Sequence, residues 1–399
     1  MKSEKRADNK NILMILQSDY PPDIRLTKEI EALVHNNYQV YLLCNNKELQ
    51  DKKEEIDGAT VIRLNRLSII PKSLRIAINL PLFFNPVWLC KILATVVRYK
   101  IDFIHVHDLP LALSGIIIAK LFRFPVVLDL HENYPAALQV WQKQGLINKI
   151  IRNPNMARTL EDICLRWADK IIVTVEEHKN LLLSRGVAES KIFIVSNTVQ
   201  YDVYTNFPFD SFIENMYKDS YNLVYVGNFS PERELEIAIQ ALVYLKKRIA
   251  NIKLLLVGDG KIKKQLQNLA TEQSVADNVE FTGWVDFEKT STFIHLADVC
   301  IIPQPSNPLI DNGVPHKLFQ YMALSKPIVV SDARPLARIV RESQCGEIFK
   351  SHSPEDFADA VLRIYHSDKN YGENGRRAVV EKYNWQETSK ELIRLYDEF

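Results

Sequence analysis

Residues 311–331 read DNGVPHKLFQYMALSKPIVVS, and this stretch decides the fold class. Its Asn-Gly-Val-Pro segment at 312–315 is a helix-start signal, so we expect a helix over 314–323. The apolar, β-branched run that follows predicts a buried strand over 327–331. A helix joined by a short turn to a fully apolar strand is typical of a parallel sheet covered by helices on both faces.

Working outward, the same alternation fills two separate series. Strands are predicted over 11–17, 39–44, 60–64, 102–106, 126–130, 170–175 and 191–195, and again over 223–227, 252–258, 279–283, 299–303, 327–331 and 346–349. Helices are predicted over 26–36, 109–121, 176–184, 232–249, 260–273, 286–296, 314–323 and 353–366, with two more in 371–399. Residues 200–220 lack a clear period and are interpreted as a connector. The sequence therefore predicts an α/β protein made of two doubly wound, Rossmann-like domains.

The two series set the expected domain boundaries. We expect an N-terminal domain over 1–205, a second domain over 206–375, and a C-terminal helix within 376–399 that packs back on the first domain. Ligands of doubly wound sheets bind beyond the carboxyl ends of the strands. With two such domains facing each other, the cleft between them is the default site.

Composition excludes several classes of protein. The 399 residues carry 50 Lys and Arg against 49 Asp and Glu, a balance that argues against a general nucleic-acid binder. The five cysteines are scattered without a Cys-x-x-Cys pair, which argues against a disulfide framework and for a cytoplasmic protein. The polar start of the chain has no apolar core of a secretory signal, and we interpret it as a solvated tail.

The stretch 69–97 is strongly apolar but is interrupted by Lys, Arg, Asn and Pro, so it does not reach the roughly 20 apolar residues of a membrane span. Two interpretations stay open. It is either a buried helix with a loop, or an interfacial segment in which the cations meet the headgroups while four apolar residues enter the membrane, namely Phe83, Phe84, Trp88 and Leu89. The second interpretation predicts peripheral contact with the inner face of the plasma membrane.

Three segments of the second half carry candidate phosphate-binding groups. The run YVGNFSPEREL at 225–235 places Arg233 shortly after a strand, and the planar fork of arginine suits a diphosphate. The run VGDG at 257–260 is a second strand-to-helix turn. The free amides of the predicted helix start after Gly313 offer a place for a phosphate, and Lys317 and Gln320 share one face of that helix.

Three segments of the first half end or follow strands. These are YPPDIRLTKE at 20–29, HVHD at 105–108 and DLHENYP at 129–135. His105 and His107 are zinc ligands by type, but no third or fourth ligand lies nearby in the sequence, so we expect no metal site. His131 can bond a hydroxyl or a phosphate oxygen as a neutral imidazole, or it can be a structural histidine.

These segments resemble glycosyltransferase family 4 over roughly 11–385, most specifically at 311–331. The resemblance implies the GT-B fold and transfer of a sugar from a UDP- or GDP-sugar with retention of configuration and without a metal. In that family two glutamates eight residues apart contact the donor sugar and the ribose, and Asn312 and Gln320 occupy those positions here. Asn228 occupies a position where arginine is commonest, which leaves Arg233 as the one matching cation of that loop.

The resemblance implies three groups of site residues. Catalytic roles fall to His131, Arg233 and Lys317; nucleotide-sugar contacts to Gly227, Asn228, Gly258, Val285, Asn312, Gly313, Val314, Leu318 and Gln320; and acceptor contacts to Asp23, Arg25, His107, Asp108 and Glu132. We expect no cofactor and no nucleic-acid partner. The expected partners are the nucleotide-sugar donor and a sugar or lipid-linked sugar acceptor of surface-polysaccharide or glycoconjugate synthesis.

Some alternatives stay open. The family's Gly-Gly is missing from 20–29, so Arg25 either replaces that phosphate contact or pairs with Glu29 at the i, i+4 spacing. Because three charged positions are amides, a GT-B scaffold or subunit without donor chemistry is the main alternative function. A GT-B-like epimerase or another α/β enzyme is a third. A Rossmann dehydrogenase is disfavoured because no strand is followed by Gly-x-Gly-x-x-Gly.

Overall fold

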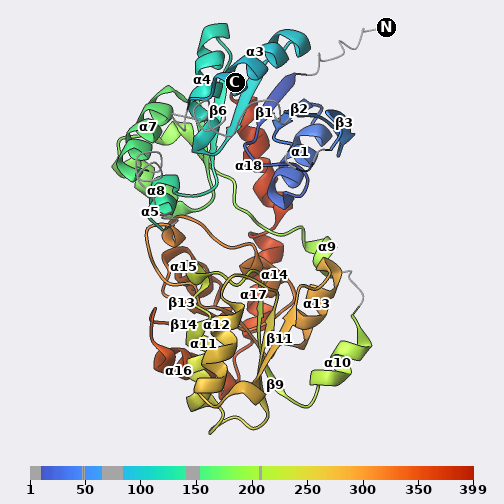
Figure 1. Ribbon diagram of the computed structural model, residues 1–399, viewed down its shortest axis with the longest axis vertical. Coiled ribbons are helices and arrows are strands. Elements are labelled where there is room, and N and C mark those ends of the chain that lie inside the picture. Colours follow the sequence, from blue (N-terminus) through green and yellow to red (C-terminus); the bar gives the residue numbers. More distant parts are fainter. Residues whose placement is uncertain (1–9, 47, 49, 65–83, 141–152, 206–208) are drawn as a thin grey trace. The chain divides into compact units, whose positions relative to one another are not determined.

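The computed structural model describes residues 10–46, 48, 50–64, 84–140, 153–205 and 209–399. The chain divides into two compact units, the first made of Met1–Ser196 with Thr388–Phe399 and the second of Asn197–Glu387. Each unit is built on one sheet (Figure 1). Among the described residues, no helix combines the length and the apolar character needed to cross a membrane.

The sheet of the first unit has eight strands: β1 (Asn11–Ile15), β2 (Gln39–Cys44), β3 (Lys53–Ile56), β4 (Ala59–Arg63), β5 (Phe103–His107), β6 (Val126–Leu130), β7 (Lys170–Val173) and β8 (Ile192–Ile194). They lie in the order β3-β4-β2-β1-β5-β6-β7-β8. β3 is antiparallel to β4, and the other neighbours are parallel. Every residue of β5 and β6 is buried, as expected for a sheet covered on both faces.

Helices cover this sheet: α1 (Ile24–His35), α3 (Pro86–Tyr99), α4 (Leu109–Phe122), α5 (Tyr134–Val140), α7 (Pro154–Trp167), α8 (Glu176–Ser184) and α18 (Trp385–Asp397). A 3-10 turn, Glu189–Lys191, precedes β8. α18 lies beside α1 and β1 (Figure 1). Its Tyr396 packs against Tyr38 and Phe103, with ring centroids 5.4 and 5.6 Å away. The C-terminal helix therefore belongs to the first unit although it is last in the sequence.

The sheet of the second unit has six parallel strands: β9 (Tyr221–Val226), β10 (Ile252–Val257), β11 (Val279–Gly283), β12 (Val299–Ile302), β13 (Ile328–Ser331) and β14 (Gly346–Phe349). Their order is β11-β10-β9-β12-β13-β14. The helices are α9 (Tyr201–Thr205), α10 (Ser211–Tyr217), α11 (Glu236–Leu245), α12 (Lys263–Glu272), α13 (Phe287–Leu296), α14 (Lys317–Ala323), α15 (Arg334–Ser343), α16 (Pro354–Tyr365) and α17 (Tyr371–Glu381). Short 3-10 turns lie at Pro231–Arg233, Ala276–Asn278 and Ile310–Asn312.

The predicted α/β class and the two parallel-dominated sheets are confirmed. The pattern missed β3, because its exposed Lys-Glu-Glu-Ile sequence has no apolar alternation; charged residues on such an edge strand oppose further pairing. The connector predicted over 200–220 contains α9 and α10, of which α10 is capped by the Asp210 carboxylate accepting from the amides of Phe212 and Ile213. α15 was also missed.

The helix predicted from 314 begins three residues later, at Lys317. Val314 precedes Pro315, and a residue before proline is pushed out of the helical region by contact with the proline ring. Gly313 follows the 3-10 turn at Ile310–Asn312 and is extended, with φ −154°. The amides of Gly313 and Val314 are therefore not part of a helical first turn.

The units divide at 196/197 and 387/388, whereas the expected boundaries were 205/206 and 375/376. Residues 197–205 and α17 pack with the second unit, where α17 lies against α14 and the backbone of Val199 accepts from Trp385 N–H at 2.8 Å. The part of the tail that packs on the first unit is 388–399.

Of the segment 69–97, residues 69–83 lie outside the described part of the chain, and most of the rest forms α3. Trp88, Ile92 and Val96 are buried in the core of the first unit. Trp88 is therefore a core residue rather than a membrane-inserting one. The opposite face of α3 exposes Leu93 and Val97, the latter at 66%.

Candidate active site

Two glycine turns lie side by side at the carboxyl edge of the second sheet. Gly227 follows β9 and Gly258 follows β10, and Gly227 N–H donates to Val257 O at 2.8 Å. Both have positive φ, 139° and 137°. A Cβ on Gly258 would lie 2.1 Å from Gly227 O, and one on Gly260 would lie 2.2 Å from Phe229 O. Only glycine allows the two turns to approach this closely.

Lys317 reaches this edge from the start of α14. Its Nζ lies 3.6 Å from the ring centroid of Tyr225 and would lie 2.7 Å from a Cβ on Gly227. Burial, and then the charge of Arg233, hold the pKa of Lys317 well below its usual range. An anion bound at the glycine turn would favour the protonated amine and restore its charge.

Arg233 lies in the 3-10 turn after β9, where its Nη1 donates to Gln304 Oε1 at 2.6 Å. Gln304 is 3% exposed and follows β12. Sequence reasoning missed Gln304, since 71 residues separate it from Arg233 and no local motif marks it. The predicted pair of Arg233 and Lys317 is brought within electrostatic reach of each other.

Asn312 and Gln320, the two amides in place of carboxylates, are largely buried, at 7% and 8% exposure. Asn312 Nδ2 donates to Pro308 O at 2.7 Å, which fixes the orientation of the side-chain amide. Its Oδ1 therefore points away from Pro308 O. Gln320 lies one turn along α14 from Lys317, as the spacing predicts. Whether these side chains contact a donor stays a prediction.

Leu318 is fully buried, and its N–H donates to Pro315 O at 3.1 Å. Its contact with a nucleotide stays a prediction. Val285 lies two residues beyond β11 and is half-buried beside the exposed Trp284. Asn228 accepts at its carbonyl from Tyr225 Oη at 3.0 Å and therefore braces the first glycine turn.

The carboxyl edge of the first sheet carries Asp108, His131 and Glu132. Asp108 has φ 62°, and its Oδ1 accepts from the backbone N–H of His131 at 3.1 Å, while Oδ2 lies 3.6 Å from the ring Nδ1. Burial and Arg25 lower the pKa of His131, but Asp108 and Asp129 outweigh them and raise it to about 9. Burial and Asp108 raise the pKa of Glu132 to about 7, against the opposing effect of His131.

Beneath this edge lies a buried cluster centred on Asp129, at the end of β6. Arg25 pairs with Glu29 at 2.9 Å and with Asp129 at 2.5 Å, so the i, i+4 pairing is confirmed. His105 and His107 join them from β5, because strand pairing places His107 opposite Asp129. Each of Glu29, His105, His107 and Asp129 has a potential ligand atom within 4.8 Å of the others. The expectation that the two histidines lack further ligand-type neighbours is wrong.

Three of the predicted acceptor residues have structural roles here. Arg25 and His107 are 7% and 1% exposed, so neither presents a usable surface to a sugar and any part in acceptor binding would be indirect. Asp23 caps α1, with its Oδ1 accepting from Leu26 N–H at 3.1 Å. Asp108 and Glu132 keep partly accessible carboxylates, and their acceptor role stays a prediction.

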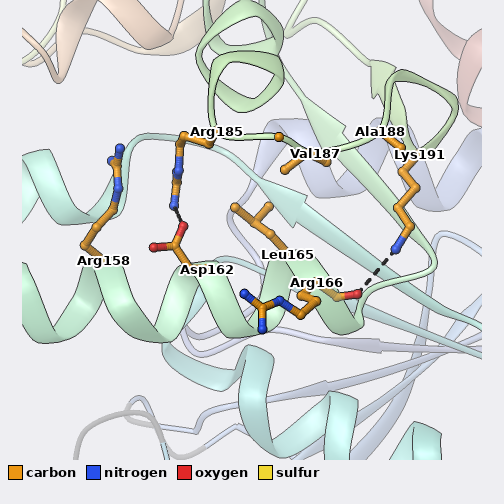
Figure 2. A pocket seen from close by; sticks show the side chains of 9 residues that line it. Arg158, Asp162, Leu165, Arg166, Arg185, Val187, Ala188 and Lys191 are labelled. Carbon is orange, nitrogen blue, oxygen red and sulfur yellow. Dashed lines mark hydrogen bonds and ion pairs between the residues drawn. The ribbon is translucent and has the colours of Figure 1, made fainter.

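A cavity of about 650 Å³ in the first unit contains none of the predicted site residues (Figure 2). It is lined mainly by residues of α7 and of the segment after α8, including Arg158, Arg166, Arg185 and Lys191. Arg185 is paired with two carboxylates of α7, including Asp162, and Lys191 Nζ donates to two backbone carbonyls. The positive charges of Arg185 and Lys191 therefore stabilise the fold through these contacts.

Two family models match the chain. The model described as Glycosyltransferase Family 4 matches residues 25–203, and that described as Glycosyl transferases group 1 matches residues 206–378. An uncharacterized glycosyltransferase of Methanocaldococcus jannaschii is 26% identical over 307 residues, which cover 75% of this chain and 76% of the relative.

Solved structures share the whole fold. Sucrose-phosphate synthase from Thermosynechococcus elongatus superposes with a TM-score of 0.79 at 20% identity, covering 98% of this chain and 99% of that one. Anabaena HepE in complex with UDP-glucose gives a TM-score of 0.69 at 15% identity, covering 98% and 100%. The fold is therefore GT-B, and the chain is a glycosyltransferase. The two models match consecutive segments of the chain, each somewhat less than half of it.

Proposed function

We propose that this chain is a retaining glycosyltransferase that moves a hexosyl group from a UDP- or GDP-sugar to a sugar hydroxyl on a lipid-linked acceptor. The observation that carries the donor side of the proposal is the position of Lys317 Nζ against Gly227, at the carboxyl edge of the second sheet. A flexible cation beside a backbone that no side chain obstructs is suited to a phosphate group.

The second unit would hold the donor diphosphate. Two glycine turns meet at this edge, where Gly227 is partly accessible and Gly258 is buried, and Lys317 and Arg233 supply the positive charge. Asn312 and Gln320 would bond the sugar and the ribose through neutral amides. Losing the charge-assisted bond of a carboxylate costs about 1 kcal/mol, which weakens donor binding without abolishing it. The HepE complex with UDP-glucose supports a donor of this class.

In the proposed step, the bond from the anomeric carbon to the β-phosphate oxygen breaks, and the acceptor oxygen bonds to the same face of that carbon. The acceptor proton passes to the departing diphosphate. Lys317 and Arg233 stabilise the negative charge that develops on the leaving group. No protein nucleophile and no metal ion at the diphosphate is needed, so adding Mg²⁺ or Mn²⁺ should leave the rate unchanged.

The first unit would serve the acceptor and the sugar through its accessible edge. Asp108 orients His131 through the backbone amide and lies close to the ring. A protonated His131 can donate to a sugar hydroxyl or to a phosphate oxygen. Glu132 and Asp108 offer carboxylate acceptors for hydroxyls of the incoming sugar.

A donor screen tests the proposal. The purified chain is incubated with UDP- and GDP-hexoses and a polyprenyl-diphosphate sugar, and the released nucleoside diphosphate is measured. We expect release with one base and one hexose, and a product that keeps the anomeric configuration by NMR. An inverted product would exclude retention. Absence of calorimetric binding to every donor tested would refute the donor site.

The lipid-linked character of the acceptor is the part of the proposal that depends on 69–97. The described portion, α3, exposes Leu93 and Val97. Replacing both with Ser should release the chain from liposomes while leaving its thermal unfolding nearly unchanged. Trp88→Ser is the matched core variant, which should instead destabilise the fold by about 3–5 kcal/mol. Equal flotation of the double variant and the unmodified chain would refute this contact.

A further inference from the structure

The buried cluster beneath the edge of the first sheet holds more ligand-type groups than the proposed transfer uses. Glu29 comes from α1, His105 and His107 from β5, and Asp129 from β6. All four are at most 1% exposed. The sheet order β1-β5-β6 and the helix after β1 bring them together from positions far apart in the chain.

The inward-facing atoms of the cluster lack partners. Glu29 Oε2, His105 Nε2, His107 Nε2 and Asp129 Oδ2 are buried, and none of them has a hydrogen-bond partner among the described residues. Asp129 Oδ2 lies 3.6 Å from His105 Nε2 and 3.5 Å from His107 Nδ1, which is too far for a hydrogen bond. Buried polar atoms are nearly always paired, so four unpaired atoms at one place call for a ligand.

The outer atoms of the same side chains are all paired. Arg25 donates to Glu29 Oε1 and to Asp129 Oδ1, so one oxygen of each carboxylate stays directed at the cluster. His105 Nδ1 lies 2.8 Å from Tyr396 Oη, and His107 Nδ1 lies 3.2 Å from His131 Nε2. Outer partners of this kind hold ligating histidines and carboxylates in the orientation that a metal requires.

Ligand type selects the ion. The two carboxylates face the guanidinium of Arg25, and Asp129 Oδ2 also lies 3.6 Å from His131 Nε2. Two imidazole nitrogens and two carboxylate oxygens suit a zinc-class transition metal, whereas Mg²⁺ and Ca²⁺ prefer oxygen ligands. In a tetrahedral zinc site with bonds of about 2.0–2.2 Å, ligand atoms lie about 3.3–3.6 Å apart. The 3.6 Å from His105 Nε2 to Asp129 Oδ2 matches this edge, and the widest separation among the four ligand atoms, within 4.8 Å, would need to contract by about 1 Å.

We propose that Glu29, His105, His107 and Asp129 form a structural zinc site inside the first unit, which ties α1 to β5 and β6. The ion takes the lone pairs of His105 Nε2 and His107 Nε2, while the Nδ1–H of His105 donates outward to Tyr396 Oη. The site is closed and buried, and it is separate from the groups proposed to hold the donor diphosphate. This inference does not rest on the proposed transfer.

The test uses the full chain without a histidine tag, dialysed against Zn²⁺ and then against metal-free buffer, with metal measured by mass spectrometry. We expect about one zinc per chain, and with Co²⁺ the visible absorption of a four-coordinate site. Glu29→Gln combined with His107→Gln should hold less than about a tenth of that zinc. His178→Gln, at a buried histidine of the same unit outside the cluster, is the matched control and should keep the full amount.

A second variant covers the case in which the double variant does not fold. Tyr396→Phe keeps all four ligands and removes only the outer partner of His105, so zinc affinity measured by chelator competition should fall about 10- to 100-fold. Zinc binding well below stoichiometric in the unmodified chain overturns the proposal. So does full zinc retention by a folded Glu29→Gln, His107→Gln variant, or an unchanged affinity in Tyr396→Phe.

Discussion

At the carboxyl edge of the first sheet, the loops after β5 and β6 carry Asp108, His131 and Glu132. At the corresponding edge of the second sheet, the loops after β9 and β10 carry Gly227 and Gly258. Both sheets are doubly wound, but the first presents ionisable side chains above a buried polar cluster, whereas the second presents two glycine turns beside Lys317 and Arg233.

The difference shows how one architecture provides two kinds of recognition. A sugar acceptor needs several oriented hydrogen-bonding groups, which side chains of different strands supply. A diphosphate needs close approach and positive charge, which glycine backbone and Lys or Arg supply. We therefore expect the second edge to be sensitive to added volume and lost charge, and the first edge to be sensitive to lost polar contacts.

The largest effect is expected from Gly258→Ala. The new Cβ would lie 2.1 Å from Gly227 O at φ 137°, so the turn must open. We expect a loss of at least about 3 kcal/mol of stability, measured by denaturant unfolding, and no donor binding by calorimetry. Gly186→Ala is the control, because Gly186 has φ 81° but no atom lies within 4 Å of the added Cβ. This variant introduces backbone strain without a steric clash and should lower the stability by about 1 kcal/mol. Equal losses in the two variants would contradict the close approach of the turns.

Arg233→Ala should reduce kcat/KM for the donor by about 10- to 100-fold, because one charge-assisted bond contributes roughly 1.5–3 kcal/mol. The rate is measured as released nucleoside diphosphate. Arg248→Ala removes an exposed arginine of the same unit and should change nothing. Unchanged kinetics in Arg233→Ala would remove this residue from the site.

Asp23→Ala should destabilise the first unit by about 1 kcal/mol through loss of the cap on α1. Asp23→Ser restores a capping oxygen without the carboxylate. If Asp23 acts only as a cap, Ser rescues both stability and acceptor KM. If the carboxylate contacts the acceptor, Ser rescues stability alone, and the KM measurement separates the two roles.

Gln320→Glu should keep or tighten UDP-sugar or GDP-sugar binding, by up to about fivefold for about 1 kcal/mol, if the position holds the ribose. Calorimetric titration of the donor gives the dissociation constant. Weaker binding would mean that the pocket around this buried side chain is built for the amide.

The smallest effect is proton uptake on nucleotide binding. Burial and Arg233 hold the pKa of Lys317 well below its usual range, and a bound diphosphate raises that pKa again. Binding should therefore take up a fraction of a proton, more at higher pH until the amine of the bound form also titrates. Calorimetry in buffers of different ionisation enthalpy measures this, and Lys317→Met should abolish it. If Lys317→Met still takes up protons on nucleotide binding, the uptake belongs to another group.

Most of the fold could be predicted from the alternation of strands and helices. Four strands match their predicted bounds: 39–44, 126–130, 279–283 and 346–349. The glycine turns and the position of Lys317 and Gln320 on one helix face also follow from local sequence. Local reasoning failed where a neighbour in space was remote in the chain or where backbone geometry overrode a motif. Gln304 against Arg233 is the first kind of failure, and the late start of α14 after Pro315 is the second.

The sequence by itself determined the two α/β series, because strand and helix periods and glycine conformations are properties of short segments. Only the tertiary structure decided that Glu29 and Asp129 surround His105 and His107, and that Trp88 lies in the core. It also decided that 388–399 completes the first unit. These juxtapositions depend on strand order and on which face of each element is covered, and no local pattern encodes either.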